Sequence, residues 1–159
     1  MATALLLAMA VLQGLQLQFR GSLALAQRQQ QRLLVGRALS LIGREAARAQ
    51  RIEVAGLGGT PAACGLAGRR VLLQLLLPGG VITYSLGAPP SPIWRGSVLM
   101  RCGPAYGLDG EPSTALPQNR VVLDGLQLQG STAQWLSAGV VQLTLQGDGV
   151  WTQVLPARD

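Results

Sequence analysis

The feature that most constrains the fold is the first third of the chain, residues 1–52, which contains no proline and begins with an apolar run that carries no charged side chain. An apolar run from Ala4 to Leu17 continues into a Gln- and Arg-rich amphipathic segment that ends near Ile52. Its few glycines each cost roughly 1 kcal/mol relative to alanine, which a helix tolerates. We therefore predict one very long helix, on the order of 75 Å at ~1.5 Å per residue. Its apolar end needs lipid or partner helices as cover.

The domain organisation follows from this helix. We predict a helical domain over residues 1–54, of which 1–18 is an apolar part for a membrane or a filament core, and a globular β-rich head over residues 55–159. The side chains expected to pack in the membrane or filament core are those of Leu5, Leu6, Leu7, Met9, Val11, Leu12 and Leu15.

Composition argues against catalysis. The chain has no histidine, which removes the commonest general base and the commonest metal ligand. The acidic residues show no paired spacing, and two cysteines alone do not complete a zinc site. We expect no enzyme activity, no cofactor, no metal and no small-molecule substrate. The net charge of +6 is spread along the chain, so solvated arginines are expected and DNA binding is a minor alternative.

The apolar run is compatible with two cellular locations of the protein, anchored in a membrane or secreted. It is short for a lone transmembrane helix, which needs ~20 apolar residues. Leu23–Ala26, just before Gln27, has the small-x-small form of a signal-peptidase site, which would release a secreted domain. No Lys or Arg precedes the run, however, and Arg20 lies on the wrong side for either a signal peptide or an anchor. A basic leader upstream of Met1 would remove both objections.

A stripe on the later part of the helix is expected to cover a sheet. Apolar residues recur there at three-, four- and seven-residue intervals. The predicted helix-to-sheet core consists of Leu34, Ala38, Leu41, Ile42, Ala49 and Ile52. The arginines beside this stripe, such as Arg44 and Arg48, are expected to stay in water.

The pattern after residue 69 is β. Predicted strands are Val71–Leu77, Val81–Leu86, Ile93–Arg101, Arg120–Leu123 broken at Asp124-Gly125 from Leu126–Leu128, Val140–Leu145 and Val150–Leu155. A small antiparallel sheet cannot bury its apolar face alone, and the helix stripe is the expected cover. The predicted fold class is α+β: a long N-terminal helix packed on a small antiparallel sheet of five to six strands.

The two cysteines, Cys64 and Cys102, form an even pair in a chain expected to leave the cytoplasm. This predicts a disulfide between the loop after the helix and the third strand.

Several segments, in order along the chain, resemble one family. Ala4–Val11 resembles the apolar start of a mature type IV pilin or type II secretion pseudopilin, with Ala4 where a Glu normally stands. Arg37–Ala49 is similar to the end of the long helix in minor pilins, and Val81–Leu86 with Val122–Leu126 to their strands.

The resemblance implies a pilin-like fold and a structural role. The expected function is a minor pilin or pseudopilin of a type IV pilus or type II secretion filament, held in the bacterial inner membrane by a single helix with a periplasmic head before assembly. Its expected partners are other pilin subunits, the inner-membrane assembly platform and membrane lipid. The alternative is a secreted or periplasmic β-rich binding domain with a cleaved signal peptide.

Overall fold

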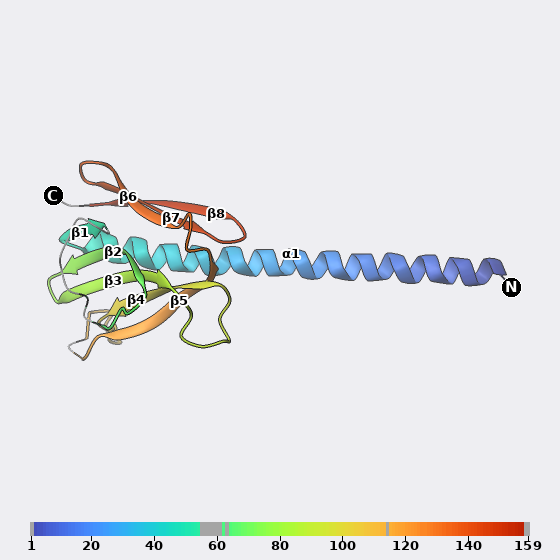
Figure 1. The fold of residues 1–159 in the computed structure, drawn as a ribbon, viewed down its shortest axis with the longest axis horizontal. Helices are drawn as coiled ribbons and strands as arrows, with labels where there is room; N and C mark the ends of the chain where they lie inside the picture. Colours follow the sequence, from blue (N-terminus) through green and yellow to red (C-terminus); the bar gives the residue numbers. More distant parts are fainter. Residues whose placement is uncertain (1, 55–61, 63, 114, 158–159) are drawn as a thin grey trace. The chain divides into compact units, whose positions relative to one another are not determined.

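The computed structural model describes residues 2–54, 62, 64–113 and 115–157, and side chains from residue 25 onward within those ranges (Figure 1). One helix, α1 (Ala2–Arg48), precedes eight strands. The strands are β1 (Arg51–Val54), β2 (Arg70–Leu77), β3 (Gly80–Gly87), β4 (Ser97–Gly103), β5 (Gln118–Leu126), β6 (Thr132–Ser137), β7 (Val140–Gln146) and β8 (Val150–Pro156). The chain divides into two compact units, residues 1–37 and 38–159.

The first unit is a single helical segment. Residues 25–34 are exposed apart from the half-buried Gln31, and Leu25 and Leu33 are 60% and 65% exposed. In the part of the helix whose side chains are described, no stretch is long and apolar enough to cross a membrane. The side chains predicted to pack in a membrane or filament core, Leu5, Leu6, Leu7, Met9, Val11, Leu12 and Leu15, lie outside the described residues.

The helix ends earlier than the sequence pattern predicted. It stops at Arg48, and Ile52 lies on β1, where it pairs with Leu75 of β2. Pairing with the edge of the sheet overrides the helical pattern here, because Ile52 and Val54 are β-branched residues that become buried in the strand.

The strands form two separate sheets. The first is a five-stranded antiparallel meander in the order β1-β2-β3-β4-β5, and the second contains β6-β7-β8. In the second sheet Val141, Leu143 and Leu145 are fully buried and alternate with polar neighbours, as the sequence pattern predicted for this strand. A hydrogen bond that Arg70 Nη2 donates to the carbonyl of Leu128 connects β2 to the segment that leads into this second sheet.

The predicted fold class is wrong. We expected a pilin-like long helix on one small sheet, but the described chain is mostly β, with antiparallel sheets of five and three strands, and 24 helical residues (25–48) described with their side chains. Sequence periodicity missed β1 and β6. The sequence pattern also predicted a turn at Asp124-Gly125, whereas β5 continues through these two residues. Gly125 adopts a φ of 70° at a register shift, and its N–H donates to the Arg95 carbonyl.

The last turns of α1 lie between the two sheets (Figure 1). A Cβ built on Gly43 would lie 2.5 Å from Nε2 of Gln153 on β8, whereas Glu45 bonds to side chains of β3 and β4. Residues two apart on a helix point about 200° away from each other, at 3.6 residues per turn. The two faces of this helix end therefore contact opposite sheets.

The predicted disulfide is confirmed. Cys64 and Cys102 are bonded, with their Cα atoms 5.9 Å apart. Cys102 is fully buried on β4 and pairs in register with Asn119 of β5, so the bridge ties the segment before β2 to an interior strand of the first sheet.

Candidate binding pocket at the end of the helix

A buried carboxylate organises the contact between the helix and the first sheet. Glu45 is 2% exposed, and its Oε1 accepts from Arg101 Nε at 2.8 Å and from the Tyr106 hydroxyl at 2.9 Å. Its Oε2 accepts from the Tyr84 hydroxyl. Donors from β3, from β4 and from the loop that follows β4 thus converge on one side chain of α1, which satisfies the carboxylate despite its burial.

The same cluster accommodates the guanidinium of Arg101. Arg101 Nη1 donates to the carbonyl of Pro104 at 2.9 Å, and its Cζ lies 5.2 Å from the centre of the Tyr106 ring, a cation–π distance. Its buried Nη2 has no acceptor among the described residues.

The electrostatics of the cluster favour a charged Arg101 and neutral tyrosines. Burial and the negative charge of Glu45 both raise the pKa of Tyr84 and Tyr106 above the ordinary value of 10.0. Burial lowers the pKa of Arg101, but attraction to Glu45 raises it, and the net direction is upward. The phenols therefore act as permanent hydrogen-bond donors.

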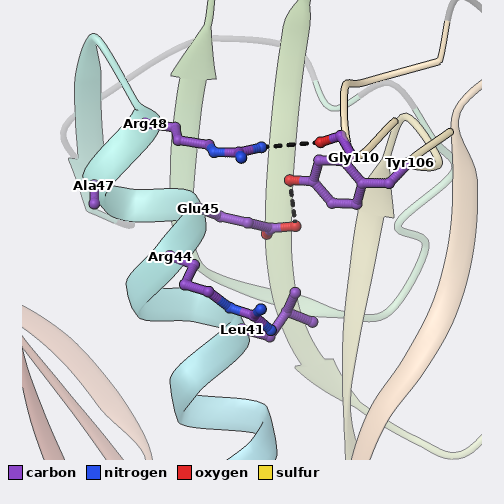
Figure 2. A pocket seen from close by; sticks show the side chains of 7 residues that line it. All are labelled: Leu41, Arg44, Glu45, Ala47, Arg48, Tyr106 and Gly110. Carbon is purple, nitrogen blue, oxygen red and sulfur yellow. Dashed lines mark hydrogen bonds between the residues drawn. The ribbon is translucent and has the colours of Figure 1, made fainter. Parts of the chain in front are cut away.

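A pocket opens beside this cluster, and Figure 2 shows its lining. Its volume is about 460 Å³, within the range typical of small-molecule sites. The lining residues are Leu41, Arg44, Glu45, Ala47, Arg48, Tyr106 and Gly110. Glu45 and Arg48 extend from α1 towards the segment that carries Tyr106 and Gly110, and the Arg44 side chain lies beside Leu41 (Figure 2). Arg48 Nη1 donates to the Gly110 carbonyl at 3.1 Å, which closes one side of the pocket.

The structure divides the predicted helix-to-sheet residues into three groups. Ala38, Ile42 and Ala49 are buried, with Ile42 fully so, and Ile52 is buried on β1. Leu41 is half-buried and lines the pocket. Leu34 is 42% exposed, so its assignment to the core is wrong: it lies one turn before Ala38 on the same side of the helix, but the buried positions among the described helix residues begin only at Val35.

Sequence reasoning missed the central residue of the site. Neither Glu45 nor Tyr84 is among the residues predicted from the sequence to form a site. The signal was present in the stripe itself: Ala38, Ile42, Glu45 and Ala49 follow one another at intervals of four, three and four residues. An acid in a buried position of a helical stripe requires donors from another element.

Two further findings concern cofactors and relatives. No group of His, Cys, Asp or Glu residues in the described part of the chain is arranged to hold a metal ion. No family model, curated protein or solved structure is significantly similar to this chain.

Proposed function

We propose that this protein is a structural subunit that assembles through its N-terminal helix, as a minor pilin or pseudopilin does in a pilus or secretion filament. The observation that carries the proposal is the first unit: one helical segment whose described residues 25–34 are almost all exposed. A single helix has no interior, and helices in water gain most of their stability from packing an apolar face against something else.

The apolar residues of this segment indicate what kind of cover it needs. Leu25 and Leu33 are more than half exposed, and the sequence before them, from Ala4 to Leu17, carries no charged residue. Lipid or neighbouring apolar helices remove such side chains from water, at ~25 cal/mol per Å². An inner-membrane anchor that later packs among other subunits meets this need in both of its states.

The disulfide supports the location of the head. Disulfides persist in oxidising compartments such as the periplasm and are rare in the cytosol. A bonded Cys64–Cys102 pair therefore fits a head on the outer side of the inner membrane. The proposal rests on the helix and the disulfide, not on the overall fold, because the head has two sheets where the resemblance implied one.

The experiment places a charge in the apolar segment. Leu7→Arg costs on the order of 3 kcal/mol at the centre of a bilayer and should abolish both membrane retention and cross-linking to partner subunits in cells. Gln30→Arg, a matched change at an exposed position of the same helix, should alter neither. Normal retention and cross-linking of Leu7→Arg would refute the proposal. N-terminal sequencing that finds a start at Gln27 would establish the alternative, a secreted domain.

A further inference from the structure

We propose that the pocket beside Glu45 binds a carboxylate group carried on a short apolar stem. This inference is independent of how the helix assembles, because all of its lining residues belong to the second unit.

The first argument is an excess of positive charge. Arg44 and Arg48 are four residues apart on α1, so they occupy the same face, and like charges at this spacing destabilise a helix. Glu45 does not neutralise them, because its carboxylate is already engaged by Arg101 and two tyrosines. The pocket therefore carries two guanidinium groups whose repulsion an anion would relieve.

The second argument is the number of available donors. A guanidinium has five N–H donors. Arg48 uses Nη1 on the Gly110 carbonyl, which fixes the side chain across the pocket, and within the described residues no acceptor contacts the Arg44 guanidinium. The two planar guanidinium groups lie on one wall of the pocket, and that of Arg48 is held in place. This arrangement suits bidentate hydrogen bonding to a carboxylate.

The third argument concerns the size of the pocket and the charge of the ligand. A cavity of about 460 Å³ holds more than a bare ion, and Leu41 and Ala47 supply apolar surface for methylene groups. Gly110 lies between Asp109 and Glu111, and these acids disfavour a dianion such as phosphate more than a single carboxylate. The Asp109 carboxylate itself is turned back into its own loop, where Oδ1 accepts from the Glu111 N–H at 3.1 Å.

Two sources present this chemistry: a free aliphatic monocarboxylate and an acidic side chain of a peptide. Butyrate and the peptide acetyl-Leu-Glu-amide are suitable probes for the two, and inorganic phosphate tests for general anion binding. Each probe is titrated into the full chain while the backbone amide resonances of Arg44, Arg48 and Gly110 are followed by NMR.

At least one carboxylate probe should give saturable shifts at these residues, and the probe that binds more tightly identifies the source. Arg44→Gln and Arg48→Gln should each raise Kd about tenfold, the equivalent of about 1.4 kcal/mol. Arg37→Gln on the same helix and Arg120→Gln on β5 are exposed arginines outside the pocket and should change Kd less than about twofold, as expected for weak long-range screening.

Three results would overturn the proposal. The first is the absence of saturable shifts at the pocket residues with either carboxylate. The second is phosphate binding as tight as that of the better carboxylate. The third is an equal loss of affinity in Arg37→Gln or Arg120→Gln, which would indicate attraction to the net positive charge rather than to this pocket.

Discussion

Glu45 Oε1 and Arg101 Nε lie 2.8 Å apart, although 56 positions separate the two residues in the sequence. Both side chains are more than nine-tenths buried. The pair joins the end of α1 to β4, the strand that also carries the disulfide-bonded Cys102. One ion pair and one covalent bridge therefore fix the same strand to two segments that precede β2 in sequence.

Removal of one partner from this pair should be strongly destabilising. Glu45→Ala leaves the Arg101 guanidinium buried without its counter-charge and deprives two tyrosine hydroxyls of their acceptor. Breaking a buried pair in this way typically costs about 3–5 kcal/mol. Denaturant unfolding of the variant measures this loss, and Glu111→Ala, which removes an exposed acid, is the control. Similar unfolding free energies for the two variants would contradict the role given to Glu45.

The tyrosines predict how stability depends on pH. The pKa values of Tyr84 and Tyr106 are raised in the folded state above the ordinary 10.0. Between the unfolded and the folded pKa, the unfolded state has lost protons that the folded state retains, so stability falls as pH rises. Their contribution is fully present below pH 10 and is lost progressively above it.

Ultraviolet absorbance measures this effect selectively, because Tyr84 and Tyr106 are the two tyrosines of the chain. Tyrosinate should appear only as the protein unfolds in alkali, in step with the loss of β-structure by circular dichroism. Tyr84→Phe should flatten the decline of unfolding free energy with pH by up to about 1.4 kcal/mol per pH unit, the value for one proton. Reversible ionisation of both tyrosines near pH 10 without unfolding would show that the cluster is solvated.

Two adjacent residues on α1 distinguish the core from the pocket. Ile42 is fully buried, whereas Leu41 is half-buried and lines the pocket. Ile42→Ala should leave a cavity and cost about 2–5 kcal/mol, and Leu41→Ala should cost clearly less. Urea unfolding of both variants tests the assignment. A larger loss for Leu41→Ala would mean that the buried face of the helix has been misassigned.

Most of the strands could be predicted from sequence because their signals are local, and the disulfide because the chain has two cysteines. The alternation of Val141, Leu143 and Leu145 with polar residues indicates a strand that is buried on one face, wherever that strand lies. The division into two sheets could not be predicted in this way. It depends on which strands pair, and β6, which forms the edge of the second sheet with mostly exposed side chains, has no apolar alternation to reveal it.

The pocket was hidden for a related reason. Its walls come from α1 and from the segment around Tyr106 and Gly110, which is rich in proline and glycine and carries no periodic pattern. Arg44 and Arg48 were correctly expected to be exposed, but exposure alone does not show what faces them. Two tertiary contacts bring the two sides of the site together: Arg48 donates to the Gly110 carbonyl, and the Tyr106 hydroxyl donates to Glu45.

The disulfide should stabilise the head through the loop that it closes. Cys64 and Cys102 are separated by 38 positions, and closing a loop of that length contributes about 4 kcal/mol in the chain-entropy model. Cys64→Ala, Cys102→Ala and the double variant all lose the same bridge. Apart from the packing of the fully buried Cys102 side chain, their losses in unfolding free energy should therefore be similar rather than additive. Thiol titration of the unmodified protein under denaturing, non-reducing conditions is the accompanying measurement, and it should detect no free thiol. Two free thiols per chain, or losses that simply add in the double variant, would show that the bridge does not form in the protein.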